Sequence, residues 1–159
     1  IEEYAIVPGH QKEFYAYEVD GYGQYNIMDD ANIPSLLAMP YIGYCKKNAE
    51  RYLNTREVIL SEWNPYYYSG KVLHGIGSPH TAPGCVWMMA LCIQGLTSQS
   101  EEEKQQILDM LCNGDAGTNL MHESVNANDP YDYTRPWFSW ANSVFCEFIM
   151  QIIGYSVII

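Results

Sequence analysis

The 159 residues match one domain in length, and an apolar share of 48% is enough to bury a core. With 17% charged residues and a formal net charge of −11, the composition argues against a disordered tail or a coiled coil. It also lacks the basic surface that binds nucleic-acid phosphate or an anionic membrane, so no nucleic-acid or membrane partner is expected.

The first part of the chain predicts two short strands and a turn. Residues 4–8 and 13–19 are rich in β-branched and aromatic side chains, which favour extended structure. The sequence Asp-Gly-Tyr-Gly at 20–23 is a turn signal at the end of the second segment. We therefore expect a short β-hairpin near the N-terminus.

From residue 32 onward the pattern predicts helices joined by loops. Asn32 suits a helix start before 35–44, where Pro40 favours a kink or an early end. Further helices are expected over 48–63, 85–96, 100–112 and 137–153. The helices alternate between apolar on most faces and amphipathic, which predicts an all-α array with inner and outer layers. Long loops over 64–84 and 115–136 carry most of the unusual polar residues, as functional loops do.

The cysteines indicate neither a disulfide framework nor a zinc knuckle. There are five, an odd number, and no two are spaced Cys-x-x-Cys. Most are expected to be buried as small apolar side chains. A nucleophilic Cys85 beside His80 is the weaker alternative, because Cys85 is expected to begin a buried helix.

No metal or cofactor motif is complete. His122-Glu123 lacks the second histidine of a His-Glu-x-x-His zinc helix, because position 126 is Asn. Asp30-Ala31-Asn32 resembles the start of a calcium loop, but the glycine required at the sixth position is missing. We therefore expect no metal and no cofactor.

Carboxylates in loops are better candidates for chemistry. Asp20, Asp29, Asp30 and Glu123 lie in loops or at helix starts, among aromatic residues and glycines. Glycoside hydrolysis needs two carboxyl groups, one to protonate the leaving oxygen and one to activate water or attack carbon. Each of these residues is equally suited to cap a helix or to pair with a cation such as Arg135. The abundant tyrosine, 14 residues with four tryptophans, suits either a sugar pocket or an aromatic core.

Five motifs resemble glycoside hydrolase family 125. In chain order they are Tyr-Glu-Val-Asp-Gly-Tyr-Gly at 17–23, Met-Asp-Asp-Ala-Asn-Ile-Pro-Ser-Leu-Leu at 28–37, Gly-Ile-Gly-Ser-Pro-His-Thr at 75–81, Met-His-Glu-Ser at 121–124 and Tyr-Thr-Arg-Pro-Trp-Phe-Ser-Trp-Ala-Asn at 133–142. The likeness runs from about Tyr4 to Phe148. It implies an all-α fold that forms part of an (α/α)6 barrel. It also implies a metal-independent, inverting exo-α-1,6-mannosidase that releases terminal mannose from a mannose-containing oligosaccharide or N-glycan.

The resemblance also implies roles for individual residues. Glu123 matches the general base, the catalytic residue that takes a proton from the attacking water. His122 or Arg135 is a candidate to hold its carboxylate in place. The substrate-binding residues expected from the matching motifs are Asp29, Asp30, Asn32, His80, His122 and Arg135.

The resemblance implies that residues 1–159 are the C-terminal portion of a longer catalytic domain. The general acid, an aspartate, is expected upstream of Ile1, so this chain alone should be weakly active or inactive. The apolar run that ends at Ile159 departs from the family pattern. The alternative is a non-catalytic fragment that binds mannose or a protein partner.

Overall fold

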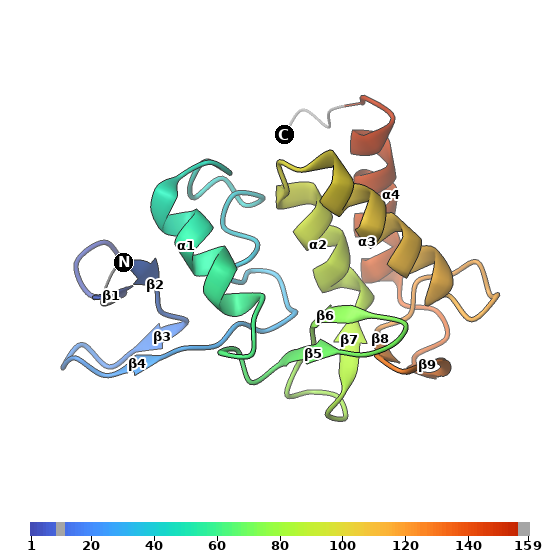
Figure 1. The fold of residues 1–159 in the computed structure, drawn as a ribbon, viewed down its shortest axis with the longest axis horizontal. Helices are drawn as coiled ribbons and strands as arrows, with labels where there is room; N and C mark the ends of the chain where they lie inside the picture. Colours follow the sequence, from blue (N-terminus) through green and yellow to red (C-terminus); the bar gives the residue numbers. More distant parts are fainter. Residues whose placement is uncertain (9–11, 156–159) are drawn as a thin grey trace.

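The computed structural model describes residues 1–8 and 12–155, and over these residues helices and small antiparallel sheets alternate (Figure 1). The N-terminal strands form two hairpins, β1 (Ile6–Val7) with β2 (Phe14–Tyr15) and β3 (Glu18–Val19) with β4 (Tyr25–Asn26). The predicted hairpin near the N-terminus is therefore present as two short ones. The apolar run toward Ile159 extends beyond the described residues.

The helices are α1 (Glu50–Ile59), α2 (Met88–Thr97), α3 (Glu101–Asn113) and α4 (Ser139–Ile152) among the described residues. Between them lie β5 (Tyr67–Ser69) paired with β6 (His74–Ile76), and a three-stranded sheet in the order β7 (Cys85–Trp87), β8 (Ser124–Asn126), β9 (Asp129–Thr134). The expectation of an all-α fold that forms part of an (α/α)6 barrel is therefore wrong for this structure.

Two misassigned segments explain the error. Residues 85–87 are a buried strand and not the first turn of a helix, because Cys, Val and Trp pair with β8 before the helix begins at Met88. The loops predicted over 64–84 and 115–136 contain the remaining strands, β5, β6, β8 and β9.

The helix expected over 35–44 is also absent. Hydrogen bonds such as Ile42 N–H to Ala38 O close separate turns. Pro34 and Pro40 have no N–H to donate, and Gly43 has a φ of +79°. The carboxylate of Asp29 further binds the amides of Leu36 and Leu37. Consecutive turns therefore replace the helix.

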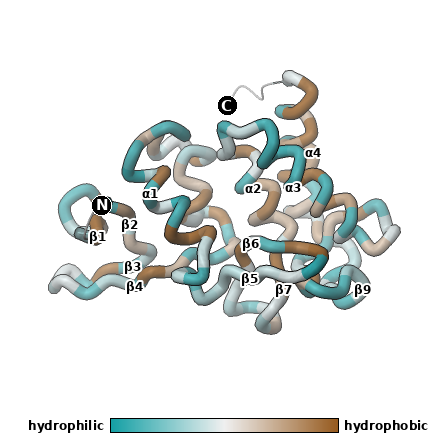
Figure 2. The backbone as a smooth tube through the Cα atoms, viewed as in Figure 1, coloured by the Kyte–Doolittle hydropathy of each residue, from teal (hydrophilic) through white to brown (hydrophobic). Residues whose placement is uncertain are grey.

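The core lies around α2. Every residue of this helix is buried, and it packs against both α3 and α4 (Figure 1). Gly95 permits the close approach to α4, because a Cβ there would lie 2.4 Å from the Phe148 ring. Figure 2 shows α3 largely hydrophilic and α4 more hydrophobic, although each of the two helices buries only three residues. Within the described residues, no helix combines the length and the apolar character needed to cross a membrane.

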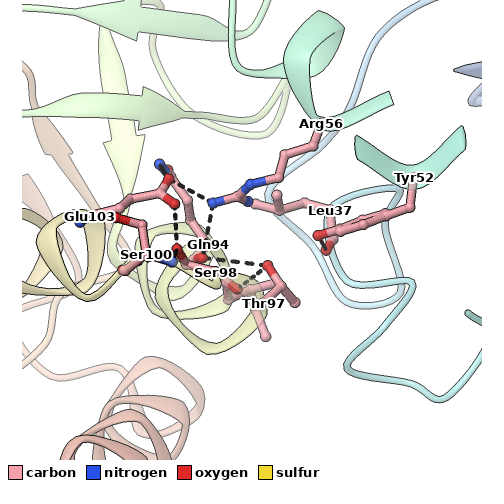
Figure 3. Close-up of polar contacts among 9 residues, drawn as sticks. Leu37, Tyr52, Arg56, Gln94, Thr97, Ser98, Ser100 and Glu103 are labelled. Atoms are coloured by element: carbon pink, nitrogen blue, oxygen red, sulfur yellow. Dashed lines mark hydrogen bonds and ion pairs between the residues drawn. The ribbon is translucent and has the colours of Figure 1, made fainter. Parts of the chain in front are cut away.

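A polar cluster, which we call the Arg56 cluster, joins α1 to α2 and α3 (Figure 3). Arg56 Nη2 pairs with Glu103 Oε1 at 2.6 Å and donates to Gln94 O at 3.3 Å. Gln94 Nε2 donates to the same Glu103 oxygen at 2.8 Å, and the Ser98 hydroxyl donates to the other. Although burial alone raises the pKa of Glu103, the bonds from Arg56, Gln94 and Ser98 hold it below its ordinary value.

Candidate active site

Glu123 directly precedes β8 and is aligned with the end of β9. The ladder places Ser124 opposite Thr134, and the Glu123 N–H donates to Thr134 O at 3.2 Å. The Thr134 hydroxyl donates to Glu123 Oε2 at 3.1 Å. Arg135 Nε lies 3.2 Å from Oε1. One hydroxyl and one cation therefore hold the two oxygens of this carboxylate, and its side chain stays 13% exposed.

Arg135 occupies an unusual position at the end of β9. Its φ is +49°, in the left-handed region that non-glycine residues rarely adopt. The guanidinium carbon lies 5.6 Å from the centre of the Phe138 ring, within cation–π range. The Arg135 side chain is 64% exposed, so it is accessible to a ligand as well as to Glu123.

His122, by contrast, is completely buried. Its ring stacks on Tyr133 with centroids 3.8 Å apart and planes 5° from parallel. Nδ1 lies 2.9 Å from Pro136 O, and Nε2 lies 3.2 Å from Asp115 O. The structure therefore surrounds this ring with protein groups, and a sugar hydroxyl has no direct path to it.

The predicted residues in the 29–32 segment also bind the protein itself. Asp29 has no exposed surface, and its oxygens accept the N–H groups of Leu36 and Leu37 at 2.8 and 3.0 Å. Burial raises the pKa of Asp29 to about 7, although these amide bonds act in the opposite direction. Asp30 accepts from the side-chain amide of Asn32 at 3.1 and 3.0 Å. Asn32 remains partly exposed.

A chain of contacts connects the 29–32 segment to Glu123. Ala31 N–H donates to Gly77 O at 3.1 Å, which brings the segment beside the loop that carries His80. In that loop Thr81 Oγ1 accepts from Trp87 Nε1 at 2.9 Å. Trp87 ends β7 opposite Ser124, next to Glu123. The separate motifs thus follow one connected path across β6, β7 and β8, which Figure 1 shows below α2 and α3.

His80 is exposed, and its main-chain N–H donates to Ser78 Oγ at 3.2 Å. A hollow of about 540 Å³ lies at the N-terminal end, where Tyr15, Tyr17, Leu36 and Tyr44 are among its lining residues. None of the predicted site residues lines it. Over residues 1–8 and 12–155, no three His, Cys, Asp or Glu side chains are grouped so that they could hold a metal ion.

Sequence reasoning missed the two residues that act on Glu123 and His122 from β9. Thr134 donates to the carboxylate, and Tyr133 stacks on the imidazole. Both lie in the 133–142 motif, so the signal was present in the sequence. The strand register that directs these two side chains toward His122 and Glu123 could not be predicted, because this segment was expected to be a loop.

Comparisons with known proteins agree with the motifs. The family model described as metal-independent alpha-mannosidase (GH125) matches residues 1–150. The chain is 51% identical over 156 residues to the "Meiotically up-regulated gene 157 protein" of Schizosaccharomyces pombe, covering 96% of this chain and 30% of that protein.

A solved structure gives the same result in three dimensions. The Streptococcus pneumoniae metal-independent alpha-mannosidase, in a non-productive complex with α-1,6-mannobiose, matches with a TM-score of 0.95 at 48% identity. The match covers 98% of this chain and 37% of that one. The chain thus spans about a third of the length of these relatives. It belongs to the GH125 family of metal-independent alpha-mannosidases.

Proposed function

We propose that the protein to which this chain belongs is an inverting exo-α-1,6-mannosidase that releases terminal mannose from mannose-rich glycans. The observation that carries the proposal is the Glu123 carboxylate, held by Thr134 and Arg135 in a chain of this family. The Streptococcus pneumoniae relative was solved with α-1,6-mannobiose, which supports a mannose-containing substrate.

In the proposed mechanism Glu123 acts as the general base. It removes a proton from a water molecule while the water oxygen attacks C1 of the terminal mannose. A second carboxylic acid protonates the departing glycosidic oxygen, and in inverting enzymes the two carboxyl groups stand roughly 6.5–9.5 Å apart, which leaves room for the water. The Thr134 hydroxyl and the Arg135 cation orient the carboxylate.

Asp29 is not proposed as the second acid, although its pKa of about 7 suits a proton donor at neutral pH. Both of its oxygens are engaged by backbone amides, and its side chain has no exposed surface. We propose instead that the acid lies in the part of the relatives' length that this chain does not span, so that the chain alone is weakly active or inactive. Asn32, His80 and Arg135, each at least partly exposed, are proposed to contact mannose hydroxyls.

The first experiment uses the complete protein and α-1,6-mannobiose, with mannose release as the readout. Glu123→Gln keeps the shape and an acceptor for Thr134 but cannot take a proton, so turnover should fall roughly 10²- to 10⁴-fold. Glu62→Gln, at an exposed glutamate outside the candidate site, is the matched control and should keep full turnover. Unchanged turnover in Glu123→Gln removes Glu123 from the mechanism.

Two further measurements test the finer parts of the proposal. Proton NMR at early time should show β-mannose as the first product, whereas α-mannose would indicate retention. Activity should survive a chelator, and loss of activity in EDTA would contradict metal independence. Binding of mannobiose without hydrolysis by the complete protein would favour a non-catalytic mannose-binding role.

A further inference from the structure

His122 contacts the chain on both sides of the two residues that hold Glu123. Its ring stacks on Tyr133, and Nδ1 lies 2.9 Å from Pro136 O. A carbonyl oxygen can only accept, so Nδ1 donates in this bond. Tyr133 and Pro136 flank Thr134 and Arg135 in the sequence, which makes the buried imidazole a fixed reference for the whole 133–136 segment.

The imidazole is itself held from the opposite side. Nε2 lies 3.2 Å from Asp115 O and 3.4 Å from Thr118 Oγ1, in the turn that follows α3. The main-chain N–H of His122 donates to Met88 Sδ at 3.1 Å, at the start of the buried helix α2. The main chain of His122 is therefore anchored to α2, and its ring lies between the turn after α3 and the 133–136 segment.

That segment needs such an anchor. Arg135 has a φ of +49°, a conformation that costs free energy for a residue with a side chain and persists when neighbouring contacts enforce it. The adjacent Pro136 carbonyl, which His122 binds, is such a contact. A relaxed backbone at 135 would redirect the guanidinium away from Glu123 Oε1, from which Nε is now 3.2 Å distant.

We propose that His122 is a positioning residue that, together with the ladder pairing Thr134 with Ser124, fixes residues 133–136 so that Thr134 and Arg135 meet the Glu123 carboxylate. The proposal rests on the proposed function, in which Glu123 is the general base. His122 was expected to bind substrate, but its complete burial, its bond to Pro136 O and its stacking on Tyr133 assign it to the protein framework. It acts on catalysis through Arg135 and Thr134, without touching sugar or water.

The first test needs no activity and uses this chain. Its three arginines, Arg51, Arg56 and Arg135, each give a side-chain Nε–H signal in a ¹⁵N-correlation spectrum, and Arg135→Lys identifies the third. His122→Phe keeps an aromatic ring on Tyr133 but removes the bond to Pro136. It should move the Arg135 signal to the position that it takes in Glu123→Gln. His74→Gln, at an exposed histidine of β6, is the control and should leave the signal in place.

The second test is kinetic and uses the complete protein. Misplaced groups around the base lower kcat, so His122→Phe should lose roughly tenfold to a hundredfold in kcat, and the displaced Arg135, which is proposed to contact mannose, should raise KM as well. His122→Gln, whose amide can donate to Pro136 O, should recover part of that loss. If His122→Phe does not fold, Tyr133→Leu removes the stacking partner at a half-buried position and should shift the same Arg135 signal.

The outcomes separate the two proposals. An unmoved Arg135 signal in folded His122→Phe, or a lower melting temperature with wild-type kcat, overturns the positioning role. If Glu123→Gln retains turnover, the proposed function fails, while the spectrum still decides whether His122 holds Arg135.

Discussion

The carboxyl group of Asp29 binds backbone amides, a structural role that its sequence motif indicates only in part. Its oxygens bind the amides of Leu36 and Leu37, which begin the turns after Pro34. Capping of the helix expected after Asn32 was one of the interpretations open from the sequence, and only its amide contacts are present. The helix that it was expected to cap does not form, since prolines and a glycine interrupt it.

This burial predicts a pH-dependent stability. The pKa of Asp29 rises from 3.8 to about 7 on folding because the carboxylate loses water. A raised acid pKa gives stability that is fully present below about pH 4 and is lost as the pH rises through 7. Between pH 5 and 8 the free energy of unfolding should fall by up to roughly 3 kcal/mol.

Urea unfolding of wild type and Asp29→Asn at both pH values checks this. The variant should be less stable than wild type at pH 5, because its amide –NH₂ faces a backbone N–H. Its free energy of unfolding should not show the fall that wild type shows toward pH 8. Equal pH dependence in the two proteins contradicts the assignment to Asp29.

Helix α3 begins where the sequence predicts, but the side chain of Glu103 has other partners than a capping box would give it. Ser100 accepts from the Glu103 N–H at 3.2 Å, as in a capping box. The Glu103 carboxylate, however, binds Arg56, Gln94 and Ser98. The motif thus identified the N-terminus of the helix, while the partners of its glutamate depend on α1, 47 residues away in sequence.

Ser100→Ala should lower the free energy of unfolding by about 1 kcal/mol, because one N-terminal amide loses its acceptor. Ser143→Ala is the control, since this exposed serine of α4 binds the carbonyl of Ser139 within its own helix. Its effect should remain within about 0.5 kcal/mol. Equal losses in both variants would rule out a specific capping contribution.

The contact between α2 and α4 depends on glycine, which has no side chain, at position 95. At Gly95 a Cβ would lie 2.4 and 2.5 Å from two atoms of the Phe148 ring, and both residues are buried. Gly95→Ala should therefore destabilise the chain by roughly 1–3 kcal/mol, despite the better helix propensity of alanine. Gln106→Ala on the exposed side of α3 is the comparison, and it should change the melting temperature little. A more stable Gly95→Ala would show that the two helices separate without cost.

The Arg56 cluster connects the α1 part of the chain to the part built on α2, α3 and α4. Its ion pair is largely buried, with the Arg56 side chain 12% and the Glu103 side chain 28% exposed. Loss of one partner leaves the other charge without compensation, so Glu103→Gln should cost roughly 3 kcal/mol. Glu102→Gln, the exposed neighbour, should cost far less.

The same cluster contributes to stability against acid. The pKa of Glu103 is lower in the folded chain than its ordinary value of 4.5. A depressed acid pKa gives stability that is present above pH 4.5 and is lost as the pH falls below it. Acid unfolding of Glu103→Gln should therefore be less steep in this range than that of wild type. Matching acid transitions would exclude Glu103 as the group responsible.

The sequence indicated the family and the site motifs better than the architecture. Periodicity identified α1, α3 and α4, because these helices are long and each has a cap, a charged face or a sustained apolar pattern. It failed at 85–87, since a three-residue apolar strand directly before an apolar helix has no period of its own. Of the two partners of Glu123, Arg135 was a candidate from the sequence, whereas Thr134 was hidden for a related reason, because its contact arises from pairing between β8 and β9.

The irregularity between Val125 and Asn126 has a consequence for variation in this hairpin. It lies on the turn side of the Ser124–Thr134 pair, and beyond it Asn126 pairs with Asp129. Residues 130–132 of β9 have no ladder partner in β8, so residues gained or lost there can be accommodated without altering the alignment of Glu123 with Thr134. A change at 127–128 would instead break the contacts of Ala127, which is buried, donates its N–H to Gly84 O and accepts from the N–H groups of Val72 and Leu73. Natural length polymorphism should therefore concentrate at 130–132, where Tyr131 and Asp132 are exposed, and an epitope or a fluorescent peptide inserted there should leave the carboxylate undisturbed.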